Sequence, residues 1–271
     1  MGGEAAQLTP ARIDFSGVDP AAPGAGRAGA EAPAAGDPFH GYLGGLPGLD
    51  SYESLAIVDG LKPESVRAFA DLVLPRGAND DGFCEIVNGA AKRIADLEGM
   101  VRRMILEGLG VAEHHEAQGE SFWHLFRMSE YRAPNSDEKV TGYIAHQDTN
   151  WLSIVCQNEV NGNEMQTRDG EWVLVEPSPT SLIVNVGNAL RAWTNDRLHA
   201  PFHRIMVSGH ATRYTCMLFS SPNFMIQVPN ELVDECHPPR FKTHDNDDFI
   251  RFCVSEEGAR HEDKLKAFCG L

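Results

Sequence analysis

One short spacing constrains this chain more than any other feature. His146 and Asp148 are separated by a single residue, and a third metal-binding side chain, His203, follows in a later segment. Residues i and i+2 of a β-strand point to the same face of a sheet, about 6 to 7 Å apart along the chain. His146 and Asp148 could therefore bind one metal ion from a single strand. Two histidines and one carboxylate form the facial triad of non-haem Fe(II) oxygenases, so the spacing predicts an iron site on a β framework.

A second spacing of two residues predicts what binds beside the metal. Arg213 and Thr215 follow the distal histidine, and on a strand they would share one face with Met217 and Phe219. A guanidinium is always charged and can donate two parallel hydrogen bonds to a planar carboxylate. We therefore expect Arg213 to hold the far end of a dicarboxylate whose near end chelates the metal.

The composition argues against several other classes of protein. The 271 residues carry a net charge of -16, whereas binding to nucleic acid requires a basic face. No apolar run approaches the roughly 18 residues of a membrane span, and the N-terminus lacks the basic and then apolar layout of a signal peptide. We expect a soluble, cytoplasmic protein that acts on a small molecule, without nucleic acid, membrane or an obligate protein partner.

Changes in pattern divide the chain into four segments. Residues 81–107 carry apolar side chains at steps of three and four, which predicts a long amphipathic helix. After residue 120 the period changes to two, which is typical of a β-sandwich or barrel, and a hairpin is expected across residues 165–175. The predicted segments are a flexible, shortened N-terminal segment (1–40), an N-terminal helical region (41–118), a dioxygenase-like β core (119–225) and a helical tail that packs on the core (226–271).

The N-terminal segment itself has two parts. Residues 11–15 (ARIDF) predict a short strand. Residues 17–38 are rich in Ala, Gly and Pro, and they have too little apolar surface to offset the entropy lost by an ordered chain. We expect this second part to be flexible.

Four longer stretches carry a resemblance to a known family. They are residues 131–134 (YRAP), 157–162 (QNEVNG), 169–173 (DGEWV) and 197–204 (RLHAPFHR). With the spacings above, they resemble the plant-type family of iron- and 2-oxoglutarate-dependent dioxygenases, and most closely its AOP-like branch. The similarity covers residues 38–271, which is much longer than a chance match of motifs. It implies a mainly β fold with flanking helices, built on a double-stranded β-helix (jelly-roll) core, with the N-terminal helical region partly missing.

The resemblance also implies particular ligands and a reaction. The implied cofactors are Fe(II), 2-oxoglutarate and dioxygen, and the family pattern allows ascorbate in addition. The reaction would be hydroxylation, desaturation or demethylation of a small organic metabolite of specialised metabolism, with release of succinate and carbon dioxide. The residues expected to bind Fe(II) are His146, Asp148 and His203; those expected to bind 2-oxoglutarate are Arg213, Thr215 and Tyr131; those expected around the substrate are Trp151, Met217, Phe219 and Phe224.

Some residues depart from the family pattern. Thr215 stands where Ser is usual and keeps the hydroxyl group. Asn163 and Asn188 stand where the family has mostly Leu and Asp, and either a reshaped pocket or a loss of constraint would explain them. Asp196 replaces a turn glycine, whose backbone conformation Asp can adopt at some strain.

Two other functions remain open at this point. A catalytically impaired family member would keep metal and 2-oxoglutarate binding, and the shortened N-terminal segment favours this alternative. A zinc-dependent hydrolase could use the same three ligands with an activated water. Such a hydrolase would not need Arg213 and Thr215 beside the metal, so these residues favour the dioxygenase.

Overall fold

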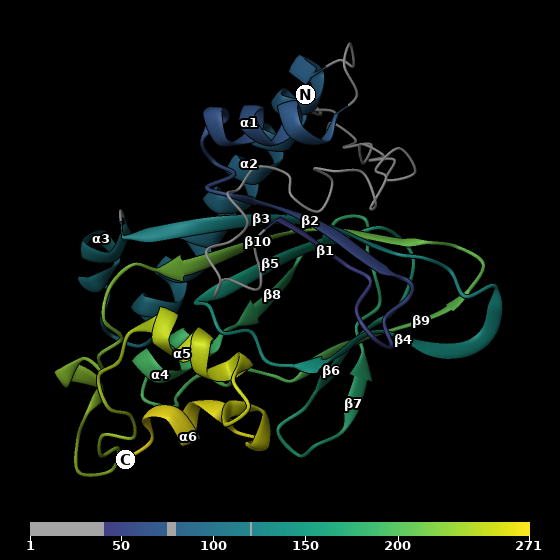
Figure 1. Ribbon diagram of the computed structural model, residues 1–271. Coiled ribbons are helices and arrows are strands. Elements are labelled where there is room, and N and C mark those ends of the chain that lie inside the picture. The colour runs from purple at the N-terminus through teal and green to yellow at the C-terminus, as the bar shows by residue number, and fades with distance from the viewer. Residues whose placement is uncertain (1–40, 75–79, 120) are drawn as a thin grey trace, which may run out of the picture.

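Two antiparallel β-sheets form the centre of the computed structural model, which describes residues 41–74, 80–119 and 121–271 (Figure 1). The larger sheet has the strand order β1-β2-β3-β10-β5-β8, and the smaller sheet has the order β4-β9-β6-β7. The larger sheet consists of β1 (Gly41–Gly44), β2 (Tyr52–Val58), β3 (Phe122–Tyr131), β10 (Arg213–Pro222), β5 (Leu152–Gln157) and β8 (Ile183–Val186). The smaller sheet consists of β4 (Ser136–His146), β9 (His203–Gly209), β6 (Asn163–Gln166) and β7 (Trp172–Leu174). This is the mainly β, jelly-roll architecture that the sequence predicts.

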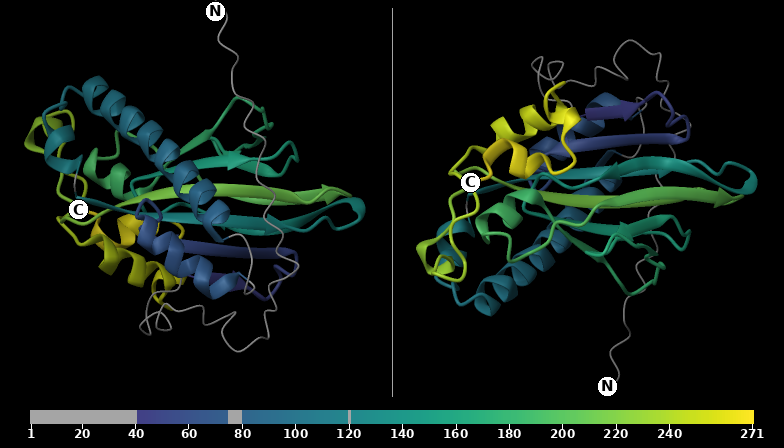
Figure 2. Two further views of the ribbon diagram at one scale, coloured as in Figure 1. Left: turned by 90° about the horizontal axis from the view of Figure 1, so that it is seen from above. Right: turned by 90° about the horizontal axis from the view of Figure 1, so that it is seen from below.

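Helices flank the two sheets. The long helix α2 runs across the strands of the larger sheet (Figure 2), and α4, α5 and α6 gather near one end of the strands (Figure 1). No helix within the described ranges is both long and apolar enough to cross a membrane. The helices are α1 (Pro63–Val73), α2 (Asp80–Gly108), α3 (His114–Gly119), α4 (Asn188–Trp193), α5 (Asn246–Val254) and α6 (Lys264–Cys269), with short 3-10 turns η2 (Asn230–Leu232) and η3 (Gly258–Arg260).

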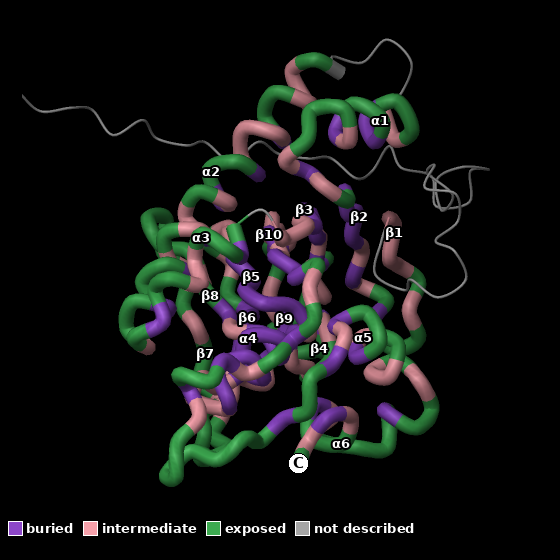
Figure 3. Tube along the Cα trace, turned by 90° about the vertical axis from the view of Figure 1, so that its left-hand side faces the viewer, coloured by how far each residue is buried: buried purple, intermediate pink, exposed green. Residues whose placement is uncertain are grey.

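Side chains along β3 and β10 point alternately to the two faces of the larger sheet, and one of these faces packs against α2. Phe126 of β3 and Leu218 of β10 form a buried core with Val87 and Ile94 of α2. Buried residues are frequent in the central strands β3, β5 and β10, whereas α1 and α2 expose much of their surface (Figure 3). The predicted helix at residues 81–107 is confirmed, although one of its apolar side chains, Ile86, is 54% exposed. The side chains that alternate with Phe126 and Leu218 point to the opposite face of the larger sheet, where a cavity lies.

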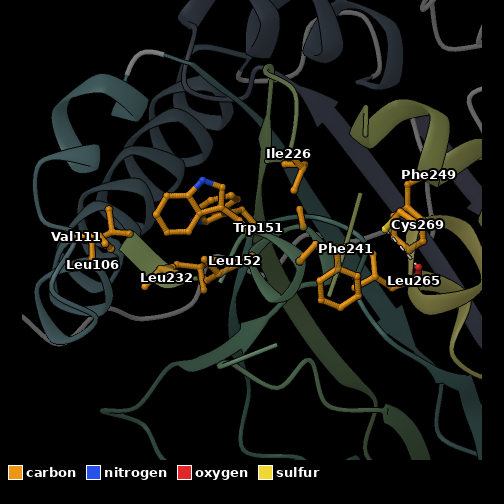
Figure 4. Close-up of a cluster of buried hydrophobic side chains, with 14 residues drawn as sticks. Leu106, Val111, Trp151, Leu152, Ile226, Leu232, Phe241, Phe249, Leu265 and Cys269 are labelled. Carbon is orange, nitrogen blue, oxygen red and sulfur yellow. Dashed lines mark hydrogen bonds between the residues drawn. The ribbon is translucent and has the colours of Figure 1, made fainter. Parts of the chain in front are cut away.

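A second core joins the end of α2 to the C-terminal helices. Trp151 and Trp193 lie with their ring centroids 5.5 Å apart in this core. Phe249 of α5 and Leu265 of α6 belong to the same fully buried cluster (Figure 4). Since an apolar side chain contributes about 1.5–3 kcal/mol when fully buried, this core holds α5 and α6 firmly beside the sheets.

The predicted helical region at residues 41–118 is only partly helical. Its first residues form β1 and β2, which extend the larger sheet. The sequence pattern concealed β2 because Leu55, Ala56 and Ile57 are all buried, so the strand does not alternate between apolar and polar residues. The strand predicted at 11–15 and the flexible stretch predicted at 17–38 lie outside the described residues.

Candidate metal centre and its cavity

Three metal-binding side chains meet at the edge of the smaller sheet. His146 ends β4 and His203 begins β9, and the two are direct partners in the antiparallel register. Their ring centroids lie 4.2 Å apart. Oδ1 of Asp148 lies 3.7 Å from Nε2 of each histidine. One ligand atom from each residue lies within 4.8 Å of the other two, so these three residues, the metal triad, are placed to bind a single ion.

Backbone carbonyl groups fix the orientation of both imidazoles. Nδ1 of His146 lies 2.9 Å from the carbonyl oxygen of Ile144, and Nδ1 of His203 lies 3.4 Å from that of Pro201. A carbonyl oxygen only accepts hydrogen bonds, so each Nδ1 carries the proton and each Nε2 keeps a free lone pair. The lone pairs therefore lie on the two Nε2 atoms, which face Asp148. An imidazole with a free lone pair on Nε2 is the form that binds a metal.

Asp148 reaches the site from a loop and not from a strand. β4 ends at His146, so the expectation that both residues lie on one strand is wrong. The backbone oxygen of Asp148 accepts a hydrogen bond from the N–H of Asn188 at 2.8 Å. Its Oδ2 accepts a second from Oγ of Ser153 on β5 at 2.6 Å. The larger sheet and the start of α4 thus orient the carboxylate.

Gly187 allows the chain to pass close behind the metal triad. A Cβ atom at this position would lie 1.9 Å from the carbonyl oxygen of Asn150, which belongs to the same loop as Asp148. The N–H of Gly187 donates to the carbonyl of Trp151 at 2.9 Å. Only glycine fits this contact, because any side chain would push the loop away.

Removing the hydroxyl group of Ser153 should weaken metal binding without removing a metal ligand. Ser153 is fully buried, and in Ser153→Ala the carboxylate of Asp148 loses its 2.6 Å hydrogen bond. Loss of such a supporting contact typically lowers metal affinity about 10- to 100-fold. Anaerobic titration with Fe(II) should show a decrease in this range. Ser220→Ala removes another fully buried hydroxyl, one that bonds to Glu98, and should leave the affinity unchanged; equal affinities for both variants would contradict the role of Ser153.

A buried guanidinium lies in the same cavity as the metal triad. Arg213 is 1% exposed and stands opposite Tyr131 in the register of β10 and β3. Its Nη2 donates to Oε1 of Gln157 at 2.6 Å. Within the described part of the chain, Nε and Nη1 of Arg213 and Oγ1 of Thr215 have no hydrogen-bond partner. Burial lowers the pKa of Arg213, yet a guanidinium stays charged. Buried donors without partners are costly, so this arrangement points to a bound anion.

The cavity has a volume of about 890 Å³ and is large enough for a cosubstrate and a small substrate together. Met217 and Phe219 line it, where the sequence places them. Trp151 and Phe224 do not line it. Trp151 belongs to the second core (Figure 4), and Phe224 packs against this core with its ring centroid 5.8 Å from that of Trp151. Trp151 lies just before β5 and Phe224 lies after the end of β10. The rule that every second residue of a strand faces the same side therefore does not apply to them.

The two departures Asn163 and Asn188 are buried in the cavity wall, where a reshaped pocket would require them. Several other cavity residues were not singled out from the sequence. Arg127, two positions before Ser129 on β3, also lines the cavity, and strand alternation with Tyr131 could have indicated it. The helical tail adds a further set, which its own spacing did not reveal: Asp247, Ile250, Arg251, Cys253, Val254, His261, Glu262 and Lys264.

Comparison with known proteins agrees with this geometry. Residues 122–222 match the 2OG-Fe(II) oxygenase superfamily. The probable 2-oxoglutarate-dependent dioxygenase AOP1.2 of Arabidopsis thaliana is 37% identical over 241 residues, which are 86% of this chain and 74% of the relative. The structure of the rice dioxygenase for auxin oxidation gives a TM-score of 0.73 at 29% identity, over 87% of this chain and 78% of that one. The 2-oxoglutarate complex of Arabidopsis thaliana dioxygenase for auxin oxidation 1 gives 0.66 at 27% identity, over 74% of each chain.

The chain therefore belongs to the 2OG-Fe(II) oxygenase superfamily. It is a 2-oxoglutarate-dependent dioxygenase similar to the plant AOP enzymes, and the enzymes of its family require Fe(II) and 2-oxoglutarate. The residues present fit both groups. Two imidazole nitrogens and one carboxylate oxygen are a suitable donor set for Fe(II), and the unpartnered donors of Arg213 and Thr215 suit a carboxylate.

Proposed function

We propose that the metal triad holds Fe(II) and that Arg213 and Thr215, with Tyr131 beside them, bind the far carboxylate of 2-oxoglutarate. The enzyme then oxidises a small organic metabolite by hydroxylation, desaturation or demethylation, and releases succinate and carbon dioxide. The observation that carries this assignment is the guanidinium of Arg213, whose Nε and Nη1 lie buried in the same cavity as the triad without a hydrogen-bond partner among the described residues.

The residues of the chain position the reactants, whereas iron and 2-oxoglutarate supply the oxidising chemistry when bound. Arg213 fixes the distance of the cosubstrate from the triad, because its planar guanidinium donates hydrogen bonds to a carboxylate in one geometry. Burial raises the pKa of Tyr131, so its hydroxyl group stays protonated and can donate a hydrogen bond. Met217 and Phe219 exclude water from the reacting atoms.

The substrate in this proposal is a small molecule with a substantial apolar part. The cavity volume and its apolar walls support this class. The similar rice and Arabidopsis thaliana structures are named for auxin oxidation, and they support a small organic substrate for this chain as well. The hydroxylation, desaturation and demethylation outcomes share the same first requirement, which is a C–H bond held near the metal triad.

Anaerobic addition of Fe(II) and 2-oxoglutarate tests the proposed roles directly. The wild-type protein should develop the visible charge-transfer band of the iron–2-oxoglutarate chelate. His203→Ala should lose the band, because it removes one of the two nitrogen ligands. His199→Ala is the matched control, since His199 lies four positions earlier and outside the cavity lining, and it should keep the band.

Two outcomes would separate this proposal from its alternatives. A folded wild-type protein without the band would contradict the proposed iron and 2-oxoglutarate site. A normal band, but no formation of succinate with any metabolite in a broad set of organic substrates, would instead support a catalytically impaired member of the family. Succinate formation that depends on one substrate would establish the enzyme and identify that substrate.

A further inference from the structure

The C-terminal helices place one lysine inside the cavity. Lys264 is the first residue of α6, is partly buried, and lines the same cavity as the metal triad. Its Nζ donates a hydrogen bond to the carbonyl oxygen of Cys253 at 2.9 Å. Within the described residues it forms no ion pair. An ammonium has three donors, so this contact leaves two of them for another group.

A chain of hydrogen bonds fixes Lys264 relative to the metal triad. Asp263 caps α6 by accepting from the N–H of Lys266, and it also accepts from Nη1 and Nη2 of Arg191 at 3.1 and 2.8 Å. Arg191 is 5% exposed and belongs to α4. The same short helix begins at Asn188, whose N–H binds the backbone oxygen of Asp148. The start of α6, and with it the backbone of Lys264, is therefore held in place relative to the metal triad.

The cavity is positive even though the chain is strongly acidic. Four cationic side chains and three carboxylates line it, whereas the whole chain has a net charge of -16. Two of the three carboxylates, Asp247 and Glu262, are exposed at the rim. The third, Asp148, belongs to the metal triad. The interior of the cavity, beyond the metal and cosubstrate positions, thus favours an anion.

The other cations of the cavity have contacts of their own. Arg213 is assigned to 2-oxoglutarate. Arg127 donates to Oγ of Ser54 at 2.6 Å in the floor, and the exposed Arg251 pairs with Asp248 at 2.6 Å. Lys264, in contrast, has the carbonyl oxygen of Cys253 as its one hydrogen-bond partner among the described residues, and it pairs with no carboxylate there.

We propose that the substrate of this enzyme carries an anionic group and that Lys264 binds this group, so that the apolar remainder of the molecule extends toward the metal triad. This proposal rests on the proposed function and adds the chemical class of the substrate. An ammonium acts as a point charge and does not require planar geometry, so a carboxylate or a sulfate ester would both be recognised. Lys264 is a binding residue in this assignment and takes no part in the oxidation.

Calorimetric titration of the protein loaded anaerobically with Fe(II) and 2-oxoglutarate tests this assignment. The ligands are small carboxylates and sulfate esters, each matched with a neutral counterpart, such as indole-3-acetate with indole-3-acetamide and phenyl sulfate with phenol. The wild type should bind the preferred anion at least about tenfold more tightly than its neutral partner, as expected for a hydrogen bond to a charged group. Lys264→Met should lose this preference, and Lys264→Arg should restore most of it.

Lys266→Met is the matched control, because Lys266 lies on the same helix but pairs with Asp263 outside the cavity. It should keep the preference for the anion. Failure of every anion to bind, equal binding of anions and neutral partners, or a preference that persists in Lys264→Met would overturn the assignment. The charge-transfer band recorded on the same samples separates the two proposals: a normal band without anion preference contradicts only the role of Lys264, whereas a missing band contradicts the proposed function.

Discussion

Replacement of Arg213 by methionine is expected to weaken the binding of 2-oxoglutarate by about 30-fold to several thousandfold. Removing one partner of a buried, hydrogen-bonded charge pair costs about 2–5 kcal/mol, and each 1.4 kcal/mol is a factor of ten in affinity. Arg213 is 1% exposed and two of its nitrogen atoms, Nε and Nη1, have no described partner, so the full loss should appear in the binding of 2-oxoglutarate. Titration of the charge-transfer band with 2-oxoglutarate at fixed Fe(II) measures the affinity.

Two further variants make this prediction specific. Arg213→Lys keeps the charge but loses the planar fork, and should therefore fall between the wild type and Arg213→Met. Arg132→Met removes an exposed arginine that pairs with Glu53 at 3.1 Å, and should bind 2-oxoglutarate as the wild type does. Fe(II) alone should still bind to Arg213→Met, since no metal ligand has changed. An unchanged 2-oxoglutarate affinity would show that this residue has been assigned wrongly.

Gly187→Ala should damage both the stability and the metal site. The added methyl group would lie 1.9 Å from the carbonyl oxygen of Asn150 and 2.9 Å from its Oδ1, so the backbone of the loop must move. Overpacking against rigid structure costs on the order of 3 kcal/mol, which corresponds to a decrease in Tm of roughly 10 °C for a chain of this size. Because Asp148 lies in the displaced loop, Fe(II) affinity should fall together with the Tm.

Gly89→Ala provides the control for this second prediction. Gly89 lies within α2, and an added Cβ there would meet no atom within 4 Å. Alanine is favoured over glycine in a helix by about 0.5–1 kcal/mol, so the Tm should stay the same or rise, and iron affinity should not change. A Gly187→Ala protein with wild-type Tm and wild-type Fe(II) affinity would show that the loop tolerates the methyl group.

The placement of the metal triad could be predicted because β-strands have a simple period. The two-residue spacing predicted that His146 and Asp148 would lie close together, and the structure brings them together with His203. The stated reason, one shared strand, was wrong, since Asp148 lies beyond the end of β4 and is oriented by Ser153 and Asn188. These partners come from other elements, and no local pattern marks contacts between segments that are distant in the sequence.

The fold was predicted best where a local pattern determines it. The helix at residues 81–107 was predicted from its apolar period, and the hairpin of β6 and β7 from its Asp-Gly turn, in which Gly170 takes a φ of 93° while Gln166 pairs with Trp172. Asp196 has a φ of 65°, as expected for a residue in place of a turn glycine. Strand β2 was missed because it is buried on both faces, and Trp151 was misplaced because strand alternation does not extend into loops.

The sheets form one wall of the cavity and the C-terminal helices form the opposite wall, so changes in substrate and changes in the oxidative chemistry would affect different elements. The proposed iron and cosubstrate residues belong to strands, or to a loop tied to them, whose register is fixed by backbone hydrogen bonds. The opposite wall belongs to α5, α6 and the segment between them, which are anchored by Arg191 and by a buried apolar cluster. Mutations of the side chains that this wall presents to the cavity can therefore give descendants with new substrates. The oxidative chemistry is then inherited unchanged.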